Sequence, residues 1–169
     1  MLKKLYSNLR PQGNEDKRLA KGGHRRFVGG RWDEMGKLQF DFLVQQGLKP
    51  PHVVLDIACG SLRAGRLLIP YLEPGNYLGM DKHSELIEAG KINEVAAPVL
   101  EAKHPEFVVS DSFAFENFSK KPDFCIAQSL FTHLHKLDIE TCFRNLSVFV
   151  GSGCRFFASF GETSIPIPQ

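Results

Sequence analysis

The stretch from His52 to Asp81 limits the possible folds of this chain more than any other segment. The short apolar run Val53 to Ile57 lies between two prolines and a turn containing Gly60, which predicts a buried strand of a parallel sheet. Leu62 to Leu72 has one apolar face and predicts a helix. Tyr77 to Asp81 predicts a second strand that ends on an acid. Strand, glycine turn, helix and strand together predict a βαβ unit that can hold a nucleoside.

The rest of the chain continues this alternation. Further helices are expected over 31–46, over 84–94 with Ser84 as N-cap, and along the apolar stripe of 139–150, and further strands over 107–109, 124–127 and 154–160. The segment around Pro98 is expected to be a connection, and 128–135 a loop. We therefore predict an α/β fold: a doubly wound, mainly parallel sheet of about five strands with helices on both faces.

Residues 1–30 differ in composition from the 31–169 domain. Apolar periodicity is poor there, and basic residues are frequent, including Lys17, Arg18, Lys21, Arg25 and Arg26. One interpretation is a solvated, partly ordered arm. The other is a lid that brings arginines to an anionic substrate, with neighbouring glycines as hinges.

Composition narrows the class of protein. A chain of 169 residues fits one domain, and a net charge of +2 gives no global field for nucleic acid or membrane. No run approaches the ~20 apolar residues of a membrane span, so a cytoplasmic protein is expected. The four cysteines form no C-x-x-C pair, so no metal site is predicted.

The turn after the first strand discriminates between nucleoside cofactors. A dinucleotide site requires G-x-G-x-x-G, and in the run Ala58 to Arg63 only Gly60 matches. Asp56 lies just before this turn, where a carboxylate suits a cationic ligand. S-adenosylmethionine carries an ammonium and a sulfonium and no phosphate, so it fits this pattern better than a dinucleotide.

Four runs resemble successive motifs of the class I S-adenosylmethionine-dependent methyltransferases: VVLDIACGSLRAGR, YLGMDKHSELIEAG, FVVSDSFAF and PDFCIAQSLFTHL. The resemblance covers roughly His52 to Phe160. It implies that the methionine part of the cofactor lies on the first turn, at Asp56, Ala58, Cys59 and Gly60. It also implies that Asp81 binds the ribose and that Asp111, with Ser112 beside it, meets the adenine amino group. The segment after the fourth strand, at Gln128 and Ser129, is implied to border the methyl group.

The chain departs from the family pattern in two places. Ala58 and Leu62 stand where the family turn D-x-G-x-G-x-G has its outer glycines, and Leu62 is expected to narrow the cofactor channel. The family sheet usually adds two strands after the fifth, and this chain is expected to lack them. An open edge strand pairs readily with other chains, so a truncated form or a homo-oligomer that covers the edge is expected, and catalytic competence stays open.

The predicted function is methyl transfer to an oxygen or nitrogen of a small-molecule or sugar-containing acceptor. No N-P-P-Y tetrad follows the fourth strand, which argues against methylation of nucleic-acid bases. His133 is the first candidate for a general base, followed by His24 and His135; alternatively, His133 is a loop histidine that bonds to backbone. Two other functions remain open: a non-catalytic S-adenosylmethionine-binding module or remnant, and an RNA-associated protein that uses the basic arm.

Overall fold

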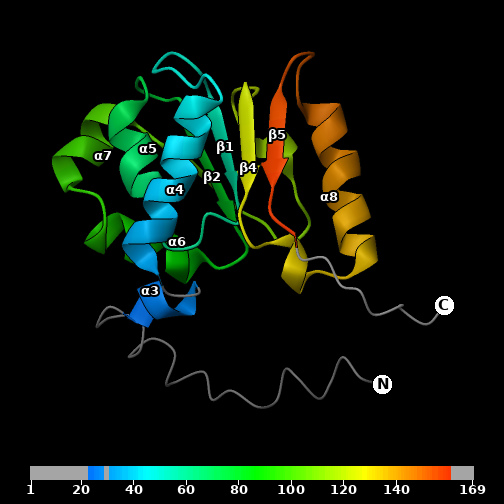
Figure 1. Ribbon diagram of the computed structural model, residues 1–169, viewed down its shortest axis with the longest axis horizontal. Coiled ribbons are helices and arrows are strands. Elements are labelled where there is room, and N and C mark those ends of the chain that lie inside the picture. The colour runs from blue at the N-terminus through cyan, green and yellow to red at the C-terminus, as the bar shows by residue number, and fades with distance from the viewer. Residues whose placement is uncertain (1–22, 29–30, 161–169) are drawn as a thin grey trace.

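A computed structural model describes residues 23–28 and 31–160, which fold around a parallel sheet (Figure 1). The sheet has five strands in the order β3-β2-β1-β4-β5, and every neighbouring pair is parallel. The strands are β1 Val54–Ile57, β2 Tyr77–Asp81, β3 Glu106–Val109, β4 Phe124–Ala127 and β5 Arg155–Ala158. This arrangement confirms the predicted α/β fold.

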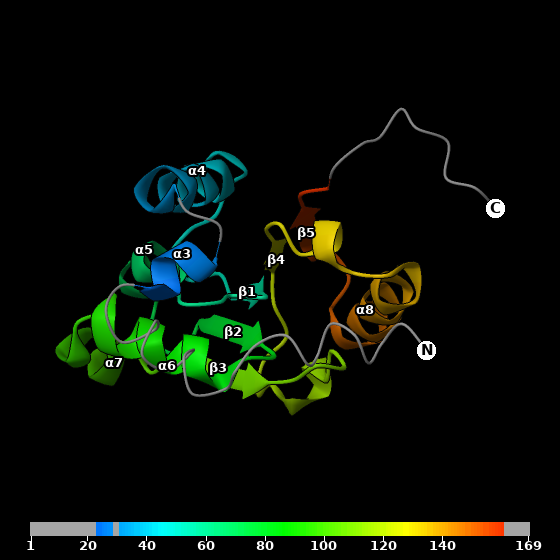
Figure 2. The ribbon, with the colours of Figure 1, turned by 90° about the horizontal axis from the view of Figure 1, so that it is seen from below.

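Helices cover both faces of the sheet, as Figure 2 shows from below. Helices α4 to α7 lie on one face, and α8 lies on the other. The helices are α3 His24–Phe27, α4 Trp32–Gln45, α5 Gly65–Tyr71, α6 Ser84–Asn93, α7 Ala97–Lys103 and α8 Lys136–Phe149, with 3₁₀ turns η3 Phe115–Asn117 and η4 Phe131–His133.

The sheet separates two hydrophobic cores. Side chains alternate along a strand, so Val54 of β1 joins Leu43 and Leu68 in the core under α4 and α5. Leu55 joins the core under α8, together with Leu146. All four residues of β1 are buried, which explains why three of the four are apolar instead of alternating with exposed polar residues; the exception is Asp56.

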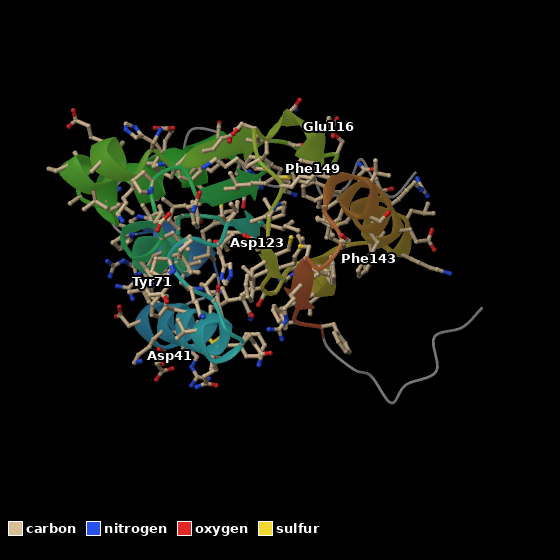
Figure 3. The ribbon with its side chains drawn as sticks, turned by 90° about the horizontal axis from the view of Figure 1, so that it is seen from above. Asp41, Tyr71, Glu116, Asp123, Phe143 and Phe149 are labelled. Atoms are coloured by element: carbon tan, nitrogen blue, oxygen red, sulfur yellow. The ribbon has the colours of Figure 1, made fainter. Side chains whose placement is uncertain are left out.

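Figure 3 views the sheet from the edge where the strands begin. Tyr71 of α5 and Phe149 of α8 lie on opposite sides of the sheet. Asp123, just before β4, marks this edge and accepts a hydrogen bond from the Val53 amide at 2.8 Å. The opposite edge, where the strands end, carries the predicted site residues.

Three predicted boundaries are wrong for identifiable reasons. The segment around Pro98 forms α7 instead of a connection, because proline is tolerated in the first turn of a helix. Helix α5 begins at Gly65, because Leu62 has a left-handed φ of 66° that a helix cannot accommodate. Ser84 is the first helical residue of α6 and does not cap it; His83 precedes the helix, and its amide is bound by Asp81.

Two negative findings apply to the described residues. No helix among them is long and apolar enough to cross a membrane. They also contain no group of His, Cys, Asp and Glu side chains that could hold a metal ion.

Candidate functional site

The turn after β1 has a left-handed backbone at three alternate positions. The φ angles are 61° at Ala58, 53° at Gly60 and 66° at Leu62. These are the positions at which the family motif carries its glycines. For a residue with a side chain, this conformation costs about 1–2 kcal/mol. The turn therefore has the left-handed backbone that favours glycine at all three positions, although only one of the three residues is a glycine.

Leu62 does not narrow a channel, contrary to the prediction. Its side chain is fully buried in the core under α4 and α5. A Cβ atom added to Gly90 of α6 would lie 2.7 Å from Cγ of Leu62 and 2.6 Å from the Ser61 carbonyl oxygen. The turn packs directly on α6 because Gly90 has no side chain, a role that no sequence pattern indicated.

Asp81, the last residue of β2, links the end of this strand to the turn after β1. Its Oδ2 accepts a hydrogen bond from the Gly60 amide at 2.9 Å, and its Oδ1 accepts one from the His83 amide at 2.9 Å. The residue is 7% exposed. A carboxylate has about four lone-pair sites, so each oxygen keeps capacity for another donor.

Asp56 lies beneath the turn. The hydroxyl group of Tyr77 donates a hydrogen bond to its Oδ2 at 2.9 Å, and the residue is 4% exposed. Burial raises the pKa of Asp56 to about 6, the Tyr77 hydrogen bond opposes this rise, and the nearby charge of Asp81 adds to it. The structure thus brings two of the three predicted acids together at the first turn.

Cys59 shares this turn but has the wrong environment for a nucleophile. Burial, and then the negative charges of Asp56 and Asp81, raise the pKa of the Cys59 thiol well above its usual value. Because the thiolate is the reactive form, Cys59 is expected to stay protonated and inert.

Asp111 and Ser112 follow β3 at the same edge of the sheet. Val109 pairs with Asp81 in the sheet, so Asp111 lies two residues beyond the level of that acid. Both residues are exposed. Ser110 shapes this loop, since its Oγ accepts the backbone amide hydrogens of Ser112 at 3.2 Å and of Ala114 at 3.1 Å.

Gln128 and Ser129 follow β4. Ile126 pairs with Asp56, so Gln128, two residues beyond this pair, lies near the level at which the turn after β1 begins. The Ser129 amide donates to Oγ of Ser159 at 2.7 Å, which joins the ends of β4 and β5.

The three candidate bases have different environments. His133 is exposed in η4, and its backbone amide bonds to the Leu130 carbonyl at 3.0 Å. His135 is exposed just before α8. His24 is 2% exposed, and its Nε2 lies 2.7 Å from Oε1 of Glu94.

The segment around α3, inside the predicted arm, packs onto the turn after β1. Arg63 donates to the Val28 carbonyl at 2.9 Å, and Ser61 donates to the His24 carbonyl at 3.3 Å. A Cβ atom at Gly60 would lie 2.7 Å from Cγ1 of Val28. Gly60 is therefore needed for this close approach. Lys17, Arg18 and Lys21 lie outside the described residues, and the boundary at residue 30 stays a prediction.

Glu94 anchors this segment and was not found from the sequence. Nε and Nη2 of Arg25 donate to its two carboxylate oxygens at 2.7 and 2.8 Å. Burial alone would raise the pKa of Glu94, but the hydrogen bonds from Arg25 and His24 outweigh it and lower the pKa below its usual range. Trp32 completes the contact, with the His24 ring edge-on at 6.0 Å and the Arg25 guanidinium 5.2 Å from its ring centroid.

No family model matches the chain. Solved structures match it at low identity. The glycopeptide N-methyltransferase MtfA is 17% identical, with a TM-score of 0.62 over 76% of this chain and 54% of that protein. Magnesium protoporphyrin IX methyltransferase ChlM from Synechocystis PCC 6803, solved with bound S-adenosylmethionine, is 18% identical, with a TM-score of 0.58 over 82% and 66%. An S-adenosylmethionine-dependent methyltransferase from Clostridium acetobutylicum is 15% identical, with a TM-score of 0.60 over 86% and 56%.

The chain therefore spans between about half and two thirds of the length of these structures. The likeness establishes the fold predicted from the sequence runs. The described residues have the Rossmann-like fold of the class I S-adenosylmethionine-dependent methyltransferases, with a sheet of five parallel strands.

Proposed function

We propose that this protein binds S-adenosylmethionine at the sheet edge where β1, β2 and β3 end, and transfers its methyl group to a small-molecule acceptor. The observation that carries the proposal is the hydrogen bond between the Gly60 amide and Asp81, beside a turn with the left-handed backbone of a glycine motif. It puts a carboxylate beside a turn that a nucleoside can approach closely once Val28 of the α3 segment has moved away from Gly60.

The side chains at this edge suit a cationic nucleoside. Asp81 has lone pairs left for the ribose hydroxyl groups, and Asp111 is exposed where the adenine amino group is expected. The turn lacks the additional glycines that the backbone needs to approach a pyrophosphate. Asp56 is buried beneath the turn. We therefore assign it an electrostatic effect on the site and not a direct contact with the cofactor.

The chain contributes positioning more than covalent chemistry. When bound, S-adenosylmethionine would supply the methyl group that an oxygen or nitrogen nucleophile accepts, and the neutral thioether would be the leaving group. Gln128 and Ser129 border the reacting centre and orient the acceptor. His133 is the proposed base that takes the acceptor proton, because its ring is exposed on the same post-β4 segment.

The α3 segment acts in this proposal as a lid over the cofactor turn. It already contacts the turn through Val28 and is tied to α6 through Glu94. A lid held at one end by an ion pair can exclude water from the turn while its other end opens for cofactor exchange.

Titration calorimetry of the full chain with S-adenosylmethionine and with S-adenosylhomocysteine tests the proposal. We expect both to bind at one site and Asp81→Ala to abolish binding. Release of S-adenosylhomocysteine in the presence of an acceptor, with loss of turnover in His133→Ala, then separates an enzyme from a binding module. Failure of both ligands to bind the wild-type chain would overturn the proposal.

A further inference from the structure

Three of the four cysteines, far apart in the sequence, meet in the core under α8. Cys125 lies on β4, Cys142 lies on α8, and Cys154 comes directly before β5. Cys125 and Cys142 are fully buried, whereas Cys154 is partly exposed. The fourth, Cys59, belongs to the core on the other face of the sheet. The fold therefore gathers thiols that no spacing motif links in the sequence.

Cys125 and Cys154 form a close pair within this group. Their Sγ atoms lie 3.5 Å apart and share a hydrogen bond. Cys125 pairs with Phe156 in the sheet, and Cys154 lies two residues before Phe156, so the two cysteine side chains point to the same face. The register of β4 and β5 therefore brings these two thiols together.

A disulfide between these two residues needs only a small movement. An S–S bond is about 2.05 Å long, so the two sulfur atoms must approach each other by about 1.5 Å. The loop before Cys154 has room for this movement, because a Cβ atom added at Gly151 or at Gly153 would meet no other heavy atom within 4 Å. Side-chain rotation and a shift of this loop together can close the distance.

The two thiols are not equivalent as nucleophiles. The hydrogen bond from Cys125 lowers the pKa of Cys154, against the opposing effects of partial burial and of the nearby Asp123 charge. The same hydrogen bond, and then burial, raise the pKa of Cys125. Burial also raises the pKa of Cys142, to about 11. Because the thiolate is the reactive form, we expect the more exposed Cys154 to react first.

We propose that Cys154 and Cys125 form a reversible disulfide when the chain meets a hydroperoxide, and that this bond fastens β5 to β4. The Cys154 thiolate attacks one oxygen of hydrogen peroxide, the O–O bond breaks, and hydroxide leaves, which gives a sulfenic acid on Cys154. The Cys125 sulfur then attacks the Cys154 sulfur, the S–O bond breaks, and the Cys125 proton leaves with the hydroxyl group as water. The two cysteines lose two electrons, and the peroxide gains them. A dithiol reductant reverses the reaction by thiol–disulfide exchange.

The strand β5 gains most from such a link. It lies at one end of the sheet and pairs with β4 alone among the described residues (Figure 1). The Arg155 amide donates to the Asp123 carbonyl at 2.9 Å at one end of the strand. The Ser159 amide donates to the Ala127 carbonyl at 3.1 Å at the other end. A cross-link removes the open states in which the two strands separate. This proposal does not depend on the proposed function.

Hydrogen peroxide and the full wild-type chain test the chemistry. After oxidation, the free thiols are blocked with N-ethylmaleimide and the chain is digested with trypsin, which cleaves after Lys136 and Arg144 and so separates the three cysteines. We expect mass spectrometry to find the Cys125 peptide joined to the Cys154 peptide, and dithiothreitol to release both. A bond to Cys142, a bond between two chains or no disulfide at all would overturn the proposal.

Three variants separate the roles of the cysteines. In Cys125→Ala the sulfenic acid on Cys154 has no partner, so dimedone should trap it there. In Cys154→Ser dimedone should leave the buried Cys125 unlabelled, and labelling of Cys125 would contradict the proposed order of attack. Cys142→Ala is the matched control from the same core and should form the disulfide as the wild type does. The wild-type peptide map decides the question even where a core variant fails to fold.

Hydrogen exchange measures how firmly β5 is held. The backbone amides of Arg155 and Ser159 should exchange about tenfold more slowly, or slower still, in the oxidised chain, and dithiothreitol should restore the faster rate. The Ser110 amide, which donates to the Asp81 carbonyl at 3.0 Å at the opposite end of the sheet, is the control. Its rate should change by less than about twofold. Equal rates for Arg155 and Ser159 in the two redox forms would overturn the fastening of β5.

Discussion

The Gly60 amide nitrogen and Oδ2 of Asp81 lie 2.9 Å apart, and the hydrogen bond between them joins the turn after β1 to the end of β2. The acid that the family resemblance assigns to the ribose is therefore also a structural residue. We therefore expect a substitution at Asp81 to change both the stability of the fold and the affinity for the cofactor. Asp111 is exposed, so we expect a substitution there to change only the affinity.

Asp81→Asn and Asp111→Asn test this difference as a pair. An asparagine can replace only one of the two accepting oxygens, so we expect Asp81→Asn to lower the free energy of unfolding by about 1–3 kcal/mol and to reduce S-adenosylmethionine affinity by tenfold or more. Asp111→Asn should change the free energy of unfolding by less than about 0.5 kcal/mol and weaken the cofactor about tenfold. Urea unfolding and calorimetry measure both. Wild-type affinity in Asp111→Asn would remove Asp111 from the site.

Asp56 should give folding a measurable pH dependence. Its pKa is raised to about 6 in the folded protein by burial, against about 3.9 in an unfolded chain. Between these values the folded protein keeps a proton that the unfolded chain has released. Asp56 therefore lowers the free energy of unfolding as the pH rises through the window from about 3.9 to about 6. Above this window it causes no further change in the free energy of unfolding.

Comparison with Asp56→Asn isolates this effect, because the variant cannot titrate there. We expect the stability of wild type minus that of the variant to fall by up to about 1.4 kcal/mol per pH unit inside the window. Tyr77→Phe removes the hydrogen bond that opposes the shift and should extend the fall to higher pH. Urea unfolding across the window is the measurement, and a difference that rises with pH would contradict the buried position of this carboxyl.

Ala58→Gly should be tolerated unusually well. The left-handed backbone at Ala58, with φ of 61°, costs about 1–2 kcal/mol that glycine avoids, while the extra freedom of glycine in the unfolded chain costs about 0.5–1 kcal/mol. We expect the free energy of unfolding to stay the same or to rise by up to about 1 kcal/mol. Ala102→Gly, in the ordinary helical backbone of α7, is the control and should lose about 0.5–1 kcal/mol. Equal losses in both variants would contradict the left-handed turn.

Glu94→Gln should release the α3 segment from the turn. The variant removes the charge that binds Arg25 and His24, so trypsin should cleave after Arg25 and Arg26 faster than in wild type. Glu88→Gln, which breaks only the surface pair with Lys91 on the same helix, should leave this rate unchanged. Equal rates in both variants would show that the anchor lies elsewhere.

Acid should release the same segment in the wild-type chain. The pKa of Glu94 is lowered in the folded protein, so its contribution to stability is present above the unfolded-state value of about 4.3. It is lost as the pH falls through the lower folded-state pKa. An acid-stable protease such as pepsin should show this release, and Glu94→Gln should lack it.

The sequence alone determined the fold, and it predicted the sheet edge at which the candidate site lies. Buried parallel strands are short and mainly apolar, so β1 and β4 were predicted almost to the residue. Because parallel strands end at one edge of the sheet, the three acids at or near the carboxyl ends of β1, β2 and β3 were expected to share that edge. The prediction that Leu62 narrows the cofactor channel was wrong. The sequence motif gives the position of Leu62 in the turn, but it does not show that the side chain points into the core.

Only the tertiary structure decided which groups meet. The contacts of Glu94 with Arg25 and of Gly90 with the Ser61 carbonyl join residues far apart in the sequence, and they follow from how α3 and α6 pack. Such contacts depend on the shape of two surfaces at once, which no local pattern encodes. For the same reason the charge state of Asp56 follows from its burial beside Tyr77 and could not be predicted from its place in the motif.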